Sequence, residues 1–449
     1  MYMKIAIAGT GYVGLVTAVC IASTGHTVTC VDVDEEKIRL MQQGKSPIYE
    51  ADLEELMQQH RERLTYTTDI QKAYRDADAI FIGVGTPEKK DGSANLRYVF
   101  DVAKQIAHTI EKDCVVVVKS TVPIGTNDRI EAFIKRELQH PVQVYVASNP
   151  EFLAQGTAVI DTLHASRIVL GVDSDYAEQV LREVYKGFGA PILVTNRCSA
   201  EMIKYASNDF LALKISYVNE IANLCEIVGA NIQDVTQGMG FDPRIGNRFL
   251  NAGIGYGGSC FPKDTKALHW LANFHDYEIK TVKAAIEVNE LQKLKLFKKS
   301  RKYYESLQDL TVTILGLTFK PGTDDMREAP SLVNIPMILE DGAEVHAWDP
   351  VGVENFEKIL AKNSDCDNNH IIYYDTPQEA LENADICFIF TEWEEIKKLQ
   401  PEDFLKMRNP IILDGRNCFS IEKMKQYPVI YDSIGREKIL QNQVRSWRT

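Results

Sequence analysis

The stretch KIAIAGTGYVG (residues 4–14) decides the fold, because a strand-like apolar run passes through a glycine-rich turn into the helix-like segment LVTAVCIAS. Gly9 permits the tight turn, Gly11 lets the backbone approach a pyrophosphate, and Gly14 allows the helix to pack closely on the strand. The first N–H groups of a helix have no intrahelical partner and can bind phosphate, which makes Tyr12 and Val13 candidate contacts. The pattern predicts a dinucleotide-binding β-α-β unit.

An acidic residue follows at the distance that such a unit requires. Asp32 ends the next apolar run and is placed to accept a hydrogen bond from a ribose 2′-hydroxyl. A carboxylate there repels a 2′-phosphate, so the sequence favours NAD over NADP as cofactor. Lys37 could also reach the ribose, or it could be a solvated lysine on a helix.

Apolar, β-branched runs alternate with helix-length segments on the rest of the chain. Continuous apolar runs are typical of strands that are covered on both faces of a parallel sheet. They lie at residues 4–9, 27–33, 79–85, 114–120, 142–148 and 167–172, and again at 311–317, 343–349, 370–375, 384–390, 410–415 and 428–433. From Ser199 to Tyr304 helical spacing replaces them. We predict an α/β protein with two Rossmann-like domains, residues 1–198 and 305–449, joined by a central long-helix segment at 199–304.

The two ends of the chain also resemble each other. KIAIAG is similar to TVTILG (311–316), and DADAIFIGVGTPE (76–88) is similar to NADICFIFTEWEE (383–395). Only the first copy keeps a complete glycine fingerprint. The second unit is therefore predicted to bind something other than a dinucleotide.

Composition narrows the class of protein. The 449 residues are 45% hydrophobic and 25% charged, and the formal net charge of −13 argues against a broadly basic surface for nucleic acid or anionic membranes. The nine cysteines include no CxxC pair and no metal-ligand spacing, which fits a reduced cytoplasmic compartment. We expect no signal peptide, no membrane span and no metal site, and NSDCDNN (363–369) is expected to be a polar surface loop.

A second glycine-rich stretch, GIGYGGSCFPKD (253–264), carries a candidate nucleophile. Its glycines would let the backbone approach a ligand closely, and Pro262 suits the first turn of a helix. Cys260 then lies at a helix N-terminus with Lys263 nearby, and both effects favour a thiolate. We interpret the other eight cysteines as small core residues.

An NAD site and an activated cysteine together indicate a reaction class. Removal of hydride from an alcohol gives an aldehyde, to which a thiolate can add. The hemithioacetal can lose a second hydride to give a thioester, and water then releases a carboxylic acid. Such chemistry also requires oxyanion donors, a general base and a carboxylate that assists hydrolysis.

A set of motifs in fixed order resembles the nucleotide-sugar 6-dehydrogenase family. The motifs are GTGYVG (9–14), GVGTP (83–87), KSTVPIGT (119–126), NPEFL (149–153), EMIKYASN (201–208), GYGGSCFPKD (255–264), GLTFKPGTDDMREAP (316–330) and DGRN (414–417). The resemblance implies two Rossmann-like domains, a central helix that forms a dimer interface, and double oxidation of a nucleotide sugar with two NAD. Among family members, the sequence is most similar to those that act on UDP-glucose.

The resemblance also implies catalytic roles. Cys260 matches the family's nucleophile, and Lys204 and Asn208 match the donors to the developing oxyanion, for which their i, i+4 spacing on a helix is suitable. Asp264 matches an aspartate that acts with Thr121 and a water in proton transfer. Glu151 matches the carboxylate that assists thioester hydrolysis near the nicotinamide.

Binding residues are implied in the same way. For the cofactor they are, beyond the glycine turn and Asp32, Lys37, Thr86, Thr121, Glu151, Lys263 and Arg327. For the nucleotide sugar they are Glu151, Phe152, Leu153, Lys204, Asn208, Phe249, Asn251, Gly253, Gly257, Lys320 and Arg416, with Arg244 contributed by a neighbouring subunit.

Several alternatives remain open from sequence. GDP-mannose or UDP-N-acetylhexosamine could be the substrate, because those enzymes share the architecture. The chain could also be a catalytically silent nucleotide-sugar sensor, although sensing requires no nucleophile; a cysteine hydrolase is disfavoured because no histidine accompanies Cys260. Gln155 stands where many relatives have glutamate, and an amide cannot act as a carboxylate base, so hydrolysis is assigned to Glu151.

Overall fold

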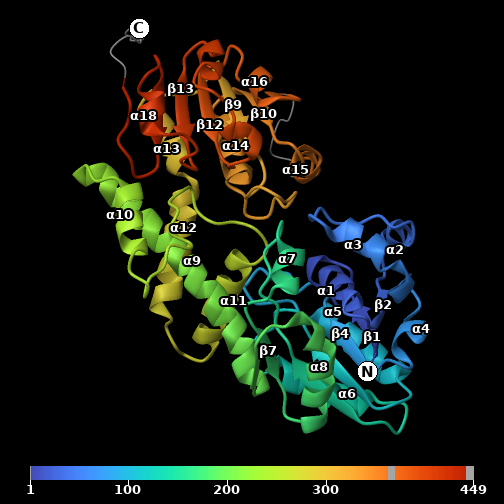
Figure 1. Cartoon of the computed structure of the whole chain (residues 1–449). Helices are drawn as coiled ribbons and strands as arrows, with labels where there is room; N and C mark the ends of the chain where they lie inside the picture. Colours follow the sequence, from blue (N-terminus) through green and yellow to red (C-terminus); the bar gives the residue numbers. More distant parts are fainter. Residues whose placement is uncertain (1, 363–369, 441–449) are drawn as a thin grey trace. The chain divides into compact units, whose positions relative to one another are not determined.

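The computed structural model describes residues 2–362 and 370–440, and the chain forms two compact units (Figure 1). The first contains residues 1–207 and 266–276, and the second contains residues 208–265 and 277–449. Cys366 and the loop predicted at 363–369 lie outside the described residues.

The described part of the first unit is built on an eight-stranded sheet with the order β3-β2-β1-β4-β5-β6-β7-β8. All pairings are parallel except that between β6 and β7, which is antiparallel. The strands are β1 (Lys4–Ala8), β2 (Thr27–Val31), β3 (Leu64–Thr67), β4 (Ala79–Ile82), β5 (Cys114–Val118), β6 (Val144–Ser148), β7 (Ile168–Gly171) and β8 (Ile192–Thr195).

Helices cover both faces of this sheet. Ile5 and Ile7 of β1 belong to one hydrophobic core, whereas Ala6 and Ala8 belong to another, so successive residues of the strand are buried on opposite sides. The helices are α1 (Tyr12–Ser23), α2 (Glu35–Gln42), α3 (Leu53–Gln59), α4 (Ile70–Tyr74), α5 (Arg97–Thr109), α6 (Thr126–Glu137), α7 (Ala158–Leu163) and α8 (Asp175–Tyr185). The predicted two-sided burial is confirmed.

The second unit repeats the arrangement on a smaller scale. Its described residues form a six-stranded, all-parallel sheet with the order β11-β10-β9-β12-β13-β14. The strands are β9 (Thr311–Leu315), β10 (Glu344–Trp348), β11 (Ile371–Tyr373), β12 (Ile386–Ile389), β13 (Ile411–Asp414) and β14 (Ile430–Ser433). The helices are α14 (Pro330–Glu340), α15 (Val353–Leu360), α16 (Pro377–Ala380), α17 (Glu394–Lys397) and α18 (Ile421–Met424). In each sheet the first strand in sequence lies between the second and the fourth, as β1 lies between β2 and β4 and β9 lies between β10 and β12. The similarity between the chain ends therefore reflects a shared topology.

The segment between the two sheets is helical, as its spacing predicts. Its longest element is α9 (Arg197–Val228), followed by α10 (Ile232–Gly240), α11 (Phe261–Phe274), α12 (Lys280–Lys293) and α13 (Lys295–Ser300). Within the described ranges, no helix combines the length and the apolar character that crossing a bilayer requires.

The sequence did not reveal two strands of the first sheet. β3 (LTYT) and β8 (ILVT) are short edge strands whose side chains are mostly half-buried or exposed. β3 has no continuous apolar run, and the apolar run of β8 is only three residues long, which is too short to indicate a strand from sequence.

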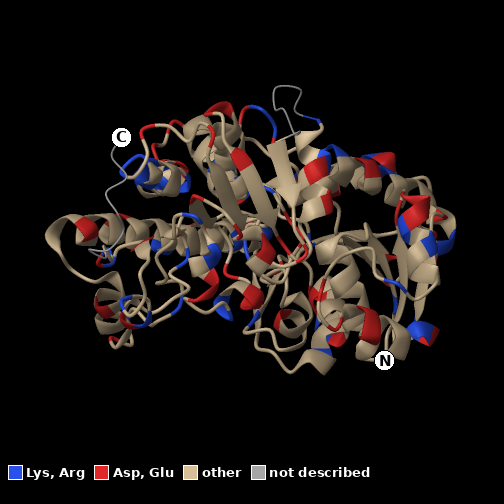
Figure 2. Ribbon diagram, turned by 90° about the horizontal axis from the view of Figure 1, so that it is seen from above, with Lys and Arg blue, Asp and Glu red and all other residues tan. Residues whose placement is uncertain are grey.

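Basic and acidic residues are interspersed along the helices and loops (Figure 2). This distribution agrees with the acidic net charge of −13. An anionic ligand must therefore be bound by particular cations rather than by a broadly positive surface.

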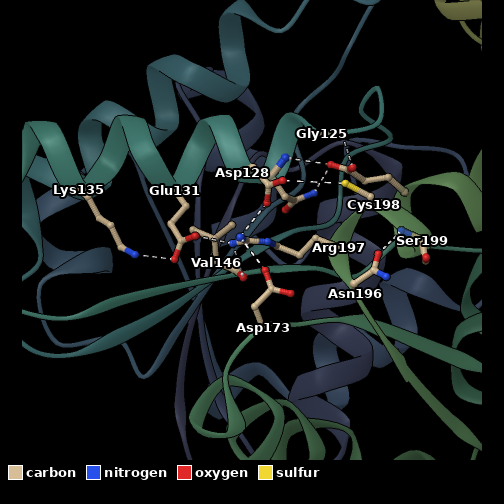
Figure 3. A network of polar contacts seen from close by, with 12 residues as sticks. Gly125, Asp128, Glu131, Lys135, Val146, Asp173, Asn196, Arg197, Cys198 and Ser199 are labelled. Atoms are coloured by element: carbon tan, nitrogen blue, oxygen red, sulfur yellow. Dashed lines mark hydrogen bonds and ion pairs between the residues drawn. The ribbon is translucent and has the colours of Figure 1, made fainter.

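Arg197 fixes the start of α9 to the sheet of the first unit (Figure 3). Its guanidinium lies 2.7 Å from each of three carboxylates, those of Asp128, Glu131 and Asp173, and it donates to the carbonyl of Val146 at 3.4 Å. The side chain is nearly buried, at 10% exposure. Burial alone raises the pKa of Glu131, but bonds from Lys135 and Arg197 bring that pKa below its usual value.

We predict that Arg197→Ala lowers the free energy of unfolding by about 2–4 kcal/mol, because three carboxylates lose their shared cation. Urea unfolding measures this loss. The control is Arg136→Ala, because the guanidinium of Arg136 is exposed, pairs with Glu137 and lies over the ring of Phe133. Since the folded pKa of Glu131 is lowered, the contribution is present above the unfolded pKa and is lost as pH falls. Equal stability of Arg197→Ala and wild type near neutral pH would contradict the assignment.

Candidate active site

The first glycine turn has the shape of a phosphate cradle. A Cβ added to Gly14 would lie 1.9 Å from the carbonyl oxygen of Gly9, so only glycine lets α1 approach the strand this closely. A Cβ added to Gly11 would meet nothing within 4 Å, so the turn is open at this position. The open turn and the N-terminus of α1 fit a dinucleotide pyrophosphate.

Asp32 is held rigidly at the end of β2. Its Oδ2 accepts from the Thr10 amide at 2.8 Å and from the Thr10 hydroxyl at 2.6 Å, and Oδ1 accepts from the amide of Asp34 at 3.1 Å. Burial raises the pKa of Asp32, but these bonds and the charge of Lys37 outweigh burial and bring the pKa below its usual value. The carboxylate is therefore ionised and suited to accept from a ribose hydroxyl.

Asp349, the counterpart of Asp32 in the second unit, is used differently. Its two oxygens accept from the amides of Leu317, Thr318, Val351 and Gly352 and from the indole of Trp393. The carboxylate thus stabilises the turn that follows β9. This supports the prediction that the second unit binds something other than a dinucleotide.

The loop that carries Thr121 is fixed from two sides. The hydroxyl of Thr86 donates to the Thr121 carbonyl at 2.9 Å. Beyond the loop, Glu201 accepts from the amides of Gly125 and Asn127 at the start of α6, where a carboxylate is favourable. Because Glu201 lies on α9 three residues before Lys204, the same helix positions both the loop and that lysine.

Lys204 and Glu151 form a buried ion pair in the first unit. Lys204 Nζ lies 2.9 Å from Glu151 Oε1 and donates to the Glu151 carbonyl at 2.8 Å. The two residues are only 3% and 7% exposed. Phe152 lies beside the pair, with the guanidinium of Arg167 at 3.9 Å and Lys204 Nζ at 5.6 Å from its ring centre. The amide of Leu153 donates to the other oxygen of Glu151.

Sequence reasoning missed Lys119, a second buried cation in this region. Its ammonium donates to Asn149 Oδ1 at 3.0 Å, and burial lowers the pKa of Lys119 to about 8, opposed by the charge of Glu151. A small cavity of about 60 Å³ is lined by Lys119, Asn149, Glu151, Phe152 and Arg167 among others. The sequence signal that could have identified Lys119 is its position directly after the apolar run CVVVV, which predicts that the lysine is buried.

Cys260 lies in the second unit, immediately before α11. Its carbonyl accepts from the amide of Asp264 at 2.8 Å, which places the cysteine at the N-terminal end of the helix. Asp264 is 1% exposed and binds two donors, Asn208 Nδ2 and Lys263 Nζ, each at 2.6 Å. The predicted residues Asn208, Lys263 and Asp264 therefore form one contact chain, which joins α9 to the first turn of α11.

Cys260 is half-buried, which sets it apart from the core thiols. Burial raises the pKa of Cys20 and of Cys114 to about 12, and it raises those of Cys30 and Cys387 further. Those thiols stay protonated and unreactive. Cys260 sits beside the Ser259 hydroxyl, with the sulfur and oxygen 3.6 Å apart.

The glycine loop before Cys260 is packed closely against the protein, which gives its glycines a structural role, while the approach of the loop to a ligand stays a prediction. A Cβ on Gly257 would lie 2.6 Å from the carbonyl of Glu328, and Gly255 has a φ of +89° beside Asn289. Asn289 also accepts from the amide of Tyr256 at 2.7 Å. Close packing of the loop holds Cys260 in one place.

Arg416 supports the same loop. It donates to the carbonyls of Gly255, Phe319 and Phe390 and lies 3.4 Å from a carboxylate oxygen of Glu392. Gly253 lies against Gly415, next to Arg416. The guanidinium is thus held at the end of β13, next to the glycine loop.

Other predicted binding residues of the second unit are more exposed. Arg244 is 87% exposed in its side chain and pairs with Asp242 of its own turn, and Arg327 pairs with Asp325. Phe249 packs its ring edge against Phe261, while Asn251 is exposed. Lys320 lies over the ring of Phe319, with 5.7 Å between the ammonium and the ring centre.

Comparison with known families finds matches to three segments of the chain. Residues 3–189 match the NAD binding domain of the UDP-glucose/GDP-mannose dehydrogenase family, residues 198–291 match its central domain, and residues 313–421 match its UDP binding domain. The chain belongs to this family of NAD-dependent oxidoreductases.

Individual relatives align over nearly the full length. The UDP-glucose 6-dehydrogenase YwqF of Bacillus subtilis is 46% identical, covering 98% of this chain and 99% of its own. The UDP-glucose 6-dehydrogenase of Rhizobium meliloti is 44% identical, covering 97% and 100%. A solved UDP-glucose dehydrogenase from Pyrobaculum islandicum superposes with a TM-score of 0.90 at 35% identity, covering 97% and 98%.

We predict that Asp32→Ala raises the Kd for NAD about 10- to 100-fold, the range for loss of one hydrogen bond to a charged group. The same variant should discriminate less against NADP, because the repelling carboxylate is gone. Titration calorimetry measures both, with Glu36→Ala, an exposed carboxylate on α2, as the control. Unchanged NAD affinity in Asp32→Ala would reject the ribose contact.

Proposed function

We propose that the chain oxidises UDP-glucose to UDP-glucuronate with two NAD and one water, releasing two NADH and protons. The observation that carries the proposal is the position of Cys260, half-buried at the start of α11 and next to the Asn208–Asp264–Lys263 chain. The names of the aligned relatives support the choice of sugar nucleotide.

The first half-reaction converts the primary alcohol of the sugar into an aldehyde. NAD, when bound, accepts the hydride from carbon in each oxidation. Asp264, through an ordered water and with Thr121, takes the hydroxyl proton. Asp264 suits this task because it is buried and hydrogen-bonded by Asn208 and Lys263, which fix its orientation.

The second half-reaction proceeds on the cysteine. The thiolate of Cys260 adds to the aldehyde carbon, and the oxygen becomes negative before a second hydride leaves to give a thioester. Lys204 and Asn208, one helical turn apart on α9, are the proposed donors to that oxygen. One preorganised donor stabilises such a charge by about 2.7–4 kcal/mol.

Hydrolysis of the thioester is assigned to Glu151. Its carboxylate directs water toward the acyl carbon of the thioester. Hydrolysis releases the sugar acid and regenerates the thiol of Cys260. The contact with Lys204 orients Glu151 inside the protein. Phe152 and Leu153 follow in the same loop, where they would flank the sugar, and Lys320, Arg416, Phe249, Asn251, Gly253 and Gly257 are proposed for the nucleotide.

We predict two NADH for each UDP-glucose consumed by wild type, and no UDP-glucuronate from Cys260→Ser. A serine hydroxyl lacks the low pKa needed to capture the aldehyde, so oxidation cannot pass to the acid. Absorbance counts NADH, and chromatography identifies the acid.

The matched control is Cys198→Ser, which alters a cysteine of similar, intermediate exposure at the start of α9. It should keep the stoichiometry of two. Acid formation by Cys260→Ser would end the covalent mechanism, whereas turnover of GDP-mannose or a UDP-N-acetylhexosamine in place of UDP-glucose would reassign the substrate. Absence of turnover with every nucleotide sugar would favour a sensor.

We further infer a homodimer in which α9 pairs with its copy. Phe210, Tyr217 and Leu224 are spaced by seven residues, and each is at least half exposed, as are Ile227 and Val228 at the end of the helix. A seven-residue apolar stripe is the pattern by which helices associate side by side. The described cysteines are free thiols, which supports a reducing, cytoplasmic setting.

We predict that Tyr217→Glu combined with Leu224→Glu shifts the solution mass from about twice 50.7 kDa to 50.7 kDa, because two charges enter the apolar stripe. Light scattering after size exclusion gives the mass. Glu354→Lys, which changes an exposed residue of α15, should leave the dimer intact. A wild-type monomer, or a variant with unchanged mass, would exclude this interface.

A further inference from the structure

Asp209 is a buried acid that the proposed reaction does not use. It follows Asn208 on α9 and is only 4% exposed. Neither of its side-chain oxygens has a hydrogen-bond partner among the residues that the structure describes. A buried carboxylate without a partner is strongly unfavourable, whereas the neutral acid is tolerated.

The groups around Asp209 reinforce this preference. Asp264 contributes a second negative charge from α11, and Lys263, the cation of the same helix turn, is already bound to Asp264. Tyr256 of the glycine loop also faces Asp209, but burial raises the pKa of its phenol and keeps it neutral. Burial first, and then the charge of Asp264, raise the pKa of Asp209 to about 8.

We propose that Asp209 is a positioning residue that, as a neutral acid beside Asp264, preserves the Asn208–Asp264–Lys263 contact chain, and that its ionisation in alkaline solution disrupts this chain. The inference rests on the proposed function, because it assigns Asp209 a task for the base and the oxyanion donor of that reaction. The structural basis is that an ionised Asp209 would add a second negative charge beside Asp264 and would attract Lys263, which is bound to Asp264.

The neutral acid contributes what an anion cannot. The protonated carboxyl is uncharged, so it adds no negative charge next to Asp264. Asp264 then remains the single anion bound to Asn208 and Lys263, with its orientation fixed. Two ionised carboxylates in this buried position would repel each other, as like charges do in other paired acids.

The test compares the pH dependence of kcat/KM for UDP-glucose in wild type and Asp209→Asn. Asparagine has the shape of the neutral acid and cannot ionise. For a group with a pKa of about 8, we expect the ratio of variant to wild-type kcat/KM to rise about tenfold from about pH 7 to about pH 9. Asp209→Ser, which also cannot ionise, should show the same rise and serves if asparagine prevents folding.

A second measurement does not depend on catalysis. The folded state binds more protons at Asp209 than the unfolded state between the ordinary value of 3.8 and about 8, so wild-type stability should fall as pH rises through this window. The fall should be smaller in Asp209→Asn. Asp234→Asn, on the exposed face of α10, is the control and should follow wild type in both measurements.

The outcomes separate the two proposals. A wild-type enzyme that oxidises UDP-glucose, with a variant-to-wild-type ratio that stays constant with pH, overturns the inference alone. A wild-type protein without activity on any nucleotide sugar overturns the proposed function and this inference together. Equal pH dependence of unfolding in Asp209→Asn and wild type would show that Asp209 does not hold the proton and would also overturn the inference.

Discussion

The buried contact between Lys204 and Glu151 is the interaction on which the rest of the first unit's site depends. An ammonium and a carboxylate that are both withdrawn from water must face each other, because either charge alone would be strongly destabilising. The pair ties α9 to the loop after β6. Arg197 and Glu201 add further contacts from the same helix to the start of α6. Ion pairs and charge-assisted hydrogen bonds therefore fix the position of α9, and they orient Lys204 in the absence of a ligand.

The two sheets show how one topology can serve two purposes. Each sheet carries an aspartate directly after its second strand: Asp32 follows β2, and Asp349 follows β10. Asp32 is held by Thr10 at an open glycine turn, whereas Asp349 accepts six hydrogen bonds from donors of its own unit. Asp32 of the first unit is therefore available to bind a cofactor, whereas the equivalent Asp349 of the second unit stabilises the loops of its own unit.

Features that depend on residues adjacent in sequence could be predicted, whereas features that depend on contacts between distant residues could not. The turn at Gly9–Gly14 and the position of Asp32 follow from adjacent residues, and both were predicted. The glycines near Cys260 can be recognised in the sequence. Their packing against Asn289 and Glu328 cannot, because these partners are distant in sequence. Lys119 and Asp209 were missed for the same reason: only burial and neighbouring charges make them unusual. The edge strand β3 was missed because LTYT has no continuous apolar run, and β8 (ILVT) was missed because its apolar run is only three residues long.

The central claim is that Cys260 carries the sugar as a thioester that Glu151 helps water to cleave. Mass spectrometry of Glu151→Gln after mixing with UDP-glucose and excess NAD tests it most directly, since the amide keeps the size of the side chain but cannot act as a base. The account predicts an acyl adduct that accumulates and maps by peptide analysis to Cys260. Release of the acid at the wild-type rate without any adduct on that cysteine would contradict it.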